Sequence, residues 1–382
     1  MSAAEDGAGS PAPTEGRSGG SGSAGAGSAG SDRAFRGGGR GVGAGESREA
    51  AALLDRTREA VEPELRRAVG SLDGTMRRVV TYHFGWEHAD GRPAAGRGGK
   101  AIRPGLVLAA ARALGGSPTA AVKAAAAVEL VHNSTLLHDD VIDRDSTRRH
   151  RPTAWTVFGD ADAILAGDAL QALAFRVLAD DPHPASGDAA ARLAACLMEL
   201  CEGQHVDTAL EDRSCDEVTL DESMSVAEAK TGALLGTACA LGALYAGAEW
   251  EQVEAMDAFG RQAGLAFQLI DDIIGIWGDP ARTGKPVGAD LLAGKKSLPV
   301  VAALASGTKA GAELAELYPK LLPADVERAA EAIDRAGGRD WAQTEAADRM
   351  SRALGLLARA VPDPDAAGGL LALAEFVTRR TA

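Results

Sequence analysis

The 382-residue sequence has few aromatic residues, few cysteines and a deficit of positive charge. Aromatics make up 4% of the chain, so alanine, leucine and valine must fill most of the core that 46% hydrophobic residues can build. The formal net charge of −14 argues against a general attraction to nucleic acid or to anionic lipid. The chain lacks an apolar run long enough to span a bilayer, and it lacks a basic segment followed by an apolar run. We therefore expect no membrane span and no secretory signal.

The four cysteines, Cys196, Cys201, Cys215 and Cys239, form no CxxC or CxxxC pair. A zinc cluster is therefore not expected, and four thiols in a chain of this length do not form a disulfide scaffold. We expect a reducing, cytoplasmic location.

Residues 1–46 are dominated by glycine, alanine, serine and proline, and they cannot bury enough apolar surface to offset their ordering entropy. We predict a disordered tail. It is either an inert extension or a segment that docks the protein onto a protein partner or compartment.

Helical periodicity predicts a single all-α domain over residues 47–382. Convincing strand alternation is not found, and short Gly/Pro/Asp breaks separate the apolar stretches. These predicted helices cover 49–69, 105–113, 119–143, 162–180, 188–210, 225–247, 250–276, 297–305, 324–336, 340–360 and 367–380.

The most informative stretch runs from Glu129 to Asp143. On an ideal helix His132, Asp139 and Asp143 fall within about 40° of one another, and Asp140 lies beside them. Isolated carboxylates are disfavoured on an apolar helix face, so their presence indicates cations, and oxygen ligands suit Mg²⁺. Arg148 and Arg149 follow directly, and guanidinium groups hold diphosphate oxygens well.

A second acidic cluster, Asp271 with Asp272, lies about 130 residues further on in another apolar helix. Gln268 lies one turn before this pair and Asp279 lies two turns after it. Cations follow in Thr283–Pro286 and Gly294–Ser297. Two such clusters predict a site in which metals and Lys/Arg groups neutralise a departing diphosphate.

Together these residues resemble the trans-isoprenyl diphosphate synthases, the polyprenyl synthetase family. Five blocks appear in the family's order: 98–104 (GGKAIRP), 129–152, 228–232 (EAKTG), 267–279, and the closing set of Gly284, Lys285, Pro286, Asp290 and Lys295. The resemblance covers the chain from about residue 50 onward. It implies an isoprenoid-synthase-type bundle of mostly antiparallel helices around a central cavity, usually in a homodimer.

The resemblance also implies roles for individual residues. Asp139 and Asp143 would bind two Mg²⁺ ions with Asp140 in support, and Asp271 would bind a third with Asp272 beside it. The allylic diphosphate would contact Arg148, Lys230 and Lys285. The diphosphate of isopentenyl diphosphate would contact Lys100, Arg103, His132 and Arg149, while Thr231 and Gln268 would line the reacting centre. Gln204 and Asp207 match a further family stretch, and either Lys295 or Lys296 would be the closing site lysine.

The sequence departs from the family pattern in three places. In the first block, Ala101 and Ile102 lie between the lysine and the arginine, where many members carry another basic residue. Gly275 stands where the second cluster would carry its last aspartate, which puts the third metal in doubt. His150 stands where many members have glycine after the arginine pair, and the sequence alone offers no physical account of it.

The implied activity is condensation of isopentenyl diphosphate with an allylic diphosphate. Ser134 and Thr135, the small residues just before the first cluster, leave the cavity floor open, which favours geranylgeranyl diphosphate or a longer product. The alternatives are a class I terpene cyclase on the same fold and a non-catalytic regulatory subunit of a synthase.

Overall fold

The structure is a computed structural model that describes residues 42–94, 99–211, 213–215, 217–279 and 287–378. Most of the predicted tail therefore lies outside the described residues, and so does Lys285. The first helix begins at Val42, a few residues before the predicted boundary of the helical domain. Within the described residues, no helix is long and apolar enough to cross a membrane.

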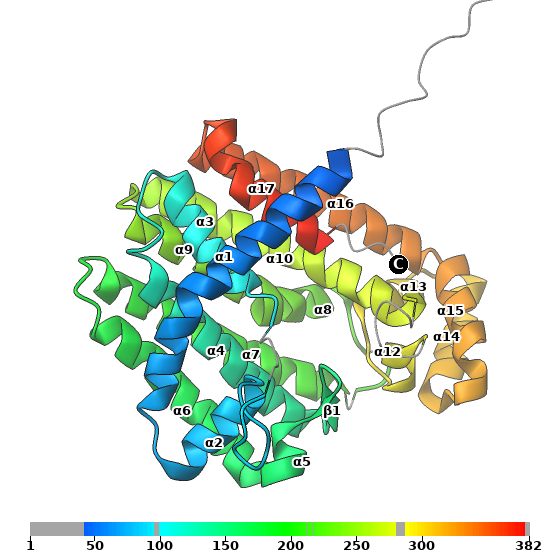
Figure 1. The fold of residues 1–382 in the computed structure, drawn as a ribbon. Helices are drawn as coiled ribbons and strands as arrows, with labels where there is room; N and C mark the ends of the chain where they lie inside the picture. Colours follow the sequence, from blue (N-terminus) through cyan, green and yellow to red (C-terminus); the bar gives the residue numbers. More distant parts are fainter. Residues whose placement is uncertain (1–41, 95–98, 212, 216, 280–286, 379–382) are drawn as a thin grey trace, which may run out of the picture. The chain divides into compact units, whose positions relative to one another are not determined.

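The described chain is built almost entirely of helices (Figure 1). In chain order these are α1 (Val42–Gly70), α2 (Gly74–His83), α3 (Ile102–Ala113), α4 (Val122–Ile142), α5 (Ala154–Phe158), α6 (Asp160–Ala179), α7 (Ser186–Glu211), α8 (Leu220–Ala227), the π-helical turn η1 (Glu228–Gly232), α9 (Ala233–Tyr245), α10 (Trp250–Trp277), α12 (Ala289–Leu292), α13 (Leu298–Leu304), α14 (Lys309–Leu317), the short turns η2 (Tyr318–Lys320) and η3 (Pro323–Asp325), α15 (Val326–Arg335), α16 (Gly338–Ala360) and α17 (Pro364–Thr378).

The all-α prediction is confirmed, but several short elements were missed. Helices α2, α5, α12 and α14 fall in stretches that were left without a helix. A two-stranded antiparallel hairpin also follows α4, with β1 (Thr147–Arg148) paired to β2 (Arg151–Pro152). Its two turn residues, Arg149 and His150, have φ of 51° and 60°. Positive φ at both central residues is the geometry of the tightest hairpin turns.

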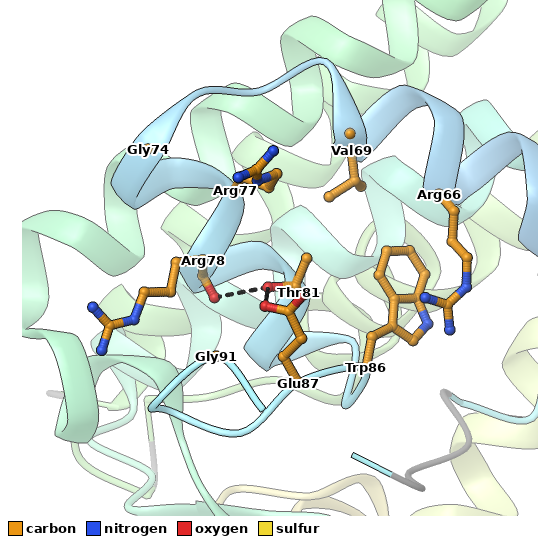
Figure 2. A pocket seen from close by; sticks show the side chains of 10 residues that line it. Arg66, Val69, Gly74, Arg77, Arg78, Thr81, Trp86, Glu87 and Gly91 are labelled. Atoms are coloured by element: carbon orange, nitrogen blue, oxygen red, sulfur yellow. Dashed lines mark hydrogen bonds between the residues drawn. The ribbon is translucent and has the colours of Figure 1, made fainter. Parts of the chain in front are cut away.

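Helices α1 and α2 and the loop after α2 enclose a cavity of about 500 Å³ (Figure 2). Arg66 lies over the Trp86 ring at 4.5 Å, and Thr81 donates a 2.9 Å hydrogen bond to Glu87. Arg78 donates at 3.0 Å to the carbonyl of Ala89. No predicted site residue is among the described residues that line this cavity.

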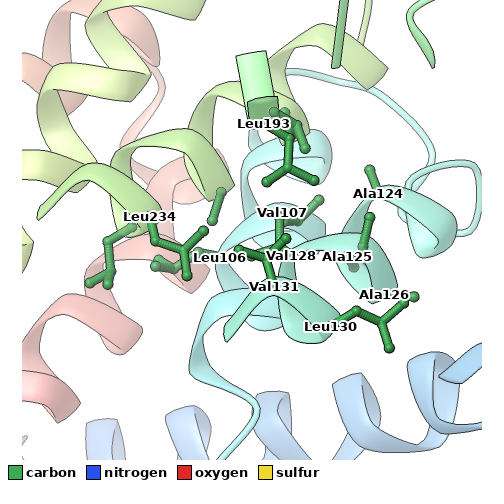
Figure 3. Close-up of a cluster of buried hydrophobic side chains, with 14 of the residues drawn as sticks. Leu106, Val107, Ala124, Ala125, Ala126, Val128, Leu130, Val131, Leu193 and Leu234 are labelled. Carbon is green, nitrogen blue, oxygen red and sulfur yellow. The ribbon is translucent and has the colours of Figure 1, made fainter. Parts of the chain in front are cut away.

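The main core lies where α3, α4, α7 and α9 meet. Leu106, Val128, Leu193 and Leu234 are buried there among small alanine side chains (Figure 3). A core of small alanine side chains allows helices to approach closely. It agrees with the prediction, from the low aromatic content, that alanine, leucine and valine fill the core.

Glycines allow the backbones of η1 and α9 to lie directly against α10. A Cβ on Gly260 would come within 2.4 Å of the Leu235 carbonyl oxygen, and one on Gly264 within 2.8 Å of the Cα of Gly232. A Cβ on Gly236 would lie 2.8 Å from the Asp257 carbonyl. This glycine seam brings Thr231 of η1 next to Gln268 of α10, where the threonine hydroxyl donates a 2.8 Å hydrogen bond to the amide oxygen.

Candidate active site

The first acidic cluster lies at the C-terminal end of α4. Asp140 is 1% exposed and accepts a 2.6 Å hydrogen bond from Nε of Arg148 on the hairpin, while its Oδ2 has no partner among the described residues. Asp143 caps the helix, one turn after Asp139. Burial raises the pKa of Asp139 to about 6, although Lys230 opposes the shift. The cluster therefore contains one carboxylate tied to the hairpin and two beside a lysine.

Lys230 reaches this cluster from the π-helical turn η1. Its ammonium group pairs with Asp207 of α7, a residue that the sequence analysis matched only to a further family stretch. Partial desolvation raises the pKa of Asp143, and Lys230 and Lys295 counteract the rise. The inserted residue of a π-helix changes the direction in which side chains project, and such turns are common at functional sites.

The second acidic cluster lies near the C-terminal end of α10. Asp271 is exposed, whereas Asp272 is 8% exposed and both of its oxygens accept hydrogen bonds. These come from Nε2 of Gln268 at 2.7 Å and from the backbone N–H of Leu298, at the start of α13, at 2.9 Å. Burial raises the pKa of Asp272 to about 7. As in the first cluster, the second aspartate of the pair is buried and bonded.

Lys295 interacts electrostatically with Asp143 of the first cluster and with neighbouring carboxylates. Partial burial lowers its pKa, but the carboxylates of Asp290, Asp143, Asp145 and Asp207 more than offset this, so the net shift is upward. Lys296 instead donates to the carbonyl of Leu210 at 2.6 Å. Lys295 therefore lies close to several acidic groups.

The predicted cationic set lies around His132, two turns before Asp139 on the same face of α4. Nη1 of Arg103 on α3 lies 3.1 Å from Nε2 of His132. Arginine can only donate, so His132 Nε2 is the acceptor and the ring is neutral with its proton on Nδ1. Burial, followed by the charge of Arg103, lowers the pKa of His132 well below its usual value, which agrees with this tautomer.

The hairpin and Gly99, just before α3, meet at this cationic set. A Cβ on Gly99 would lie 2.7 Å from Nη2 of Arg149, so the glycine makes room for the guanidinium. Lys100 is exposed, and Ala101 adopts a left-handed φ of 56° at the start of α3. Strained residues of this kind often occur at functional sites.

Sequence reasoning missed three polar residues beside these cations. Glu129 is 7% exposed, and burial raises its pKa while Arg103 and Arg149 oppose the rise. Asn133 donates at 3.1 Å to Oε1 of Glu129. His83 on α2 is the third, and burial, with the guanidinium groups of Arg149, Arg148 and Arg151, lowers its pKa to about 3. Glu129 and His132 share a helix face at i,i+3 spacing, a signal that could have found the glutamate.

Several buried polar atoms in this region have no hydrogen-bond partner among the described residues. They include Arg103 Nε, His83 Nε2, Asn133 Oδ1 and Asp140 Oδ2. Leaving a buried donor unsatisfied costs about 1–3 kcal/mol, so a group of them indicates a site built for a polar ligand.

The two residues predicted to control product length lie on α4, just before Asp139. Ser134 is fully buried and Thr135 is half-buried. Their hydroxyls donate to the carbonyls of Val131 at 2.7 Å and His132 at 2.8 Å. Both side chains are small, and the hydroxyl group of each is hydrogen-bonded to the backbone of its own helix.

The chain is similar to known prenyl diphosphate synthases. The family model for polyprenyl synthetase matches residues 92–335. The chain is 46% identical over 337 residues to the (2E,6E)-farnesyl diphosphate synthase of Mycobacterium bovis, covering 86% of this chain and 93% of that protein. It is 48% identical over 333 residues to a geranylgeranyl diphosphate synthase of Mycobacterium tuberculosis, with the same coverage.

A solved structure of a polyprenyl synthetase from Streptomyces coelicolor superposes with a TM-score of 0.82 at 43% identity. The match covers 86% of this chain and 99% of that one. Fold and site therefore define an all-α trans-prenyltransferase. The chain belongs to the polyprenyl synthetase family.

Proposed function

We propose that the protein condenses isopentenyl diphosphate with geranyl or farnesyl diphosphate in a Mg²⁺-dependent reaction, with geranylgeranyl diphosphate or a longer all-trans product. The observation that carries this proposal is the division of the site into two unlike halves. One half holds carboxylates with Lys230 and Lys295, and the other holds Arg103 and His132 with unsatisfied buried polar atoms, among them the donor Nε of Arg103.

The two halves suit two different diphosphates. The acidic half would bind the allylic diphosphate through metal, with Arg148 and Lys230 contacting its oxygens. The cationic half would bind isopentenyl diphosphate directly, because its donors need an anion. A terpene cyclase needs only one diphosphate site, so the second half favours the synthase over this alternative. The retained acidic clusters likewise favour an enzyme over a regulatory subunit.

The residues present fit Mg²⁺. Asp139, Asp143 and Asp271 offer oxygen ligands only, and Mg²⁺ commonly takes one or two protein carboxylates together with substrate phosphates and water. When bound, the metal supplies charge neutralisation of the leaving diphosphate. Three ions per site remain our prediction from the resemblance.

The chain's own residues then act on substrate. Arg103, His132 and Arg149 would orient isopentenyl diphosphate so that its terminal alkene carbon faces the allylic carbon. Thr231 and Gln268, bonded to each other across the glycine seam, would lie near the positive charge that develops there. The proton lost after condensation would pass to the departing diphosphate, so no protein nucleophile is needed.

The proposed product length rests on the small side chains of Ser134 and Thr135. Relatives at 46% and 48% identity carry farnesyl and geranylgeranyl names, so identity alone does not choose between them. Thr135→Tyr would fill space from a half-buried position, and we expect it to shorten the product. An unchanged product from a folded Thr135→Tyr protein would contradict this reasoning.

The test is product analysis with purified protein, Mg²⁺, isopentenyl diphosphate and, separately, dimethylallyl, geranyl and farnesyl diphosphate. We expect a linear prenyl alcohol of geranylgeranyl length or longer after dephosphorylation, lost in Asp139→Ala. Cyclic hydrocarbons from an allylic diphosphate alone would establish the cyclase alternative. Absence of turnover with every primer would favour the regulatory subunit.

We further propose a homodimer formed through α6 and α7, which pack side by side. Their outer faces expose Ile164, Leu165 and Met198 at 42%, 53% and 63%. Such exposed apolar patches are typical of protein interfaces. In sedimentation experiments Leu165→Glu should dissociate the dimer. Leu322→Glu, at a 62% exposed position elsewhere, should leave it intact. The cytoplasmic location stays a proposal, as does the alternative of an inert or a docking tail.

A further inference from the structure

The cavity enclosed by α1, α2 and the loop after α2 has a lining suited to a small organic anion (Figure 2). Its volume of about 500 Å³ lies within the range of small-molecule sites. Three guanidinium groups line it, those of Arg66, Arg77 and Arg78, against the single carboxylate of Glu87. In a chain with a formal net charge of −14, this lining is a local concentration of positive charge.

The three arginines differ in how far other contacts occupy them. Arg66 pairs with Glu62 at 2.7 Å and lies over the Trp86 ring, so its charge is compensated. Arg78 donates at 3.0 Å to the carbonyl of Ala89, which is a neutral acceptor. Within the described part of the chain, the Arg77 side chain has no hydrogen-bond or ion-pair partner. One turn of α2 therefore offers two guanidinium charges to an anion.

The remaining wall of the cavity is apolar and firmly held. Val69 is 1% exposed and Trp86 is 8% exposed. Phe84 stacks on Trp86 with ring centroids 4.5 Å apart, and Arg66 lies over the same ring, so the indole is fixed in place. Inorganic phosphate alone would leave this wall uncovered, whereas an anion with an apolar group would contact it.

The same loop also holds the hairpin of the active site. The Glu87 side chain accepts a 2.9 Å hydrogen bond from Thr81, and the Glu87 backbone carbonyl accepts one at 3.3 Å from Arg151. Arg151 also donates at 3.1 Å to the carbonyl of Tyr82 and lies over the Tyr82 ring at 4.5 Å. Arg151 is on β2, two residues after Arg149 of the cationic half. A change in this loop is therefore felt by the hairpin.

We propose that this cavity binds a small organic phosphate and that its occupation is passed to the cationic half of the active site through Arg151. The phosphoryl group would contact Arg77 and Arg78, because guanidinium groups bind two phosphate oxygens at once. The apolar group would contact Val69 and Trp86. The binding part does not depend on the proposed function, whereas the transmission part rests on it.

Binding is tested by calorimetric titration of phenyl phosphate into the full chain, with Mg²⁺ and inorganic diphosphate present to occupy the active site. Arg77→Gln should weaken the affinity about tenfold, as loss of a charged hydrogen bond does. Arg112→Gln, the same change at an exposed position on α3, should bind as the parent does.

A second variant fills the cavity instead of changing its charge. Gly70 lines the cavity, and an added Cβ there meets nothing within 4 Å, so Gly70→Leu should fold and abolish binding. Gly187→Leu, at another open position, should bind normally. No binding of phenyl phosphate at millimolar concentration, or equal binding by the parent and Arg77→Gln, would overturn the site. Equally tight binding of benzoate would overturn the choice of phosphate.

Transmission is tested by measuring KM for isopentenyl diphosphate with and without phenyl phosphate. A ligand that steadies the loop should steady Arg151 and the hairpin, so KM should fall about fivefold, at the lower end of typical couplings. Arg151→Gln should still bind phenyl phosphate but show no change in KM. An unchanged or raised KM in the parent would overturn the transmission. If no primer gives turnover, the proposed function fails, and calorimetry still decides whether the cavity binds.

Discussion

The glycine seam between α9 and α10 should not tolerate even one methyl group at Gly260. Its added Cβ would meet the Leu235 carbonyl oxygen at 2.4 Å and the Gly236 backbone at 2.7 Å. Ordinary contact needs about 3.5 Å, so the helices must separate by roughly 1 Å. Overpacking against backbone that cannot rotate away costs about 3 kcal/mol, and the helix propensity of alanine returns about 1 kcal/mol. We expect Gly260→Ala to lower the free energy of unfolding by about 2 kcal/mol.

The assay is urea unfolding at a fixed protein concentration, because dimerisation would make stability depend on it. Gly355→Ala is the matched control, since Gly355 lies inside helix α16 and an added Cβ there meets nothing within 4 Å. That variant should gain up to about 1 kcal/mol. If Gly260→Ala proves as stable as Gly355→Ala, the close approach of α9 and α10 is wrong.

Two further predictions concern histidines. His150→Gly should raise the free energy of unfolding by about 1 kcal/mol in urea titrations, because glycine adopts the left-handed turn without strain. His88 does not have a positive φ, so the control variant His88→Gly should lower the free energy of unfolding. The pKa of His83 is about 3 in the folded protein and near 6.5 unfolded, so the unfolded chain takes up the proton first and stability falls as pH drops below 6.5. Between pH 7 and 5 the parent should lose about 2 kcal/mol more than His83→Gln, and equal losses would contradict a buried neutral ring.

The sequence was sufficient for long helices and insufficient for short elements. The ends of α4 and α10 were predicted within a few residues because long apolar periodicity and the following breaks mark them. Helix α2 has only 10 residues and contains the β-branched run Val79–Thr81, which weakens the local helical signal. The hairpin has two-residue strands, and its turn carries Arg149 and His150 instead of glycine or asparagine. The usual sequence signal for a hairpin is therefore absent.

The hairpin geometry also explains the unexplained histidine. His150 has a φ of 60°, so a glycine in relatives would suit the same turn without strain. Histidine is among the residues that enter this region more often than most, and the hydrogen-bonded strands on either side hold it there. A substitution that looked arbitrary along the chain thus has a conformational meaning in the fold.

Within the site, the sequence predicts which side chains share a face where one helix sets the geometry, and it leaves the arrangement open where helices cross. His132 and Asp139 share a face of α4 because they are seven residues apart on one helix, and this spacing can be read from the sequence alone. Lys295 and Lys296 are adjacent, and only the packing of their loop decides that Lys295 faces the carboxylates while Lys296 bonds to Leu210. Gly275 is a second example. The motif along α10 lacks an acidic residue at this position, but the carboxylate of Asp290 on α12 lies beside it, 1.8 Å from where a Cβ on Gly275 would be. A motif along one helix therefore measures only part of an acidic cluster, and a gap in it has to be judged against the side chains that neighbouring helices bring to the same volume.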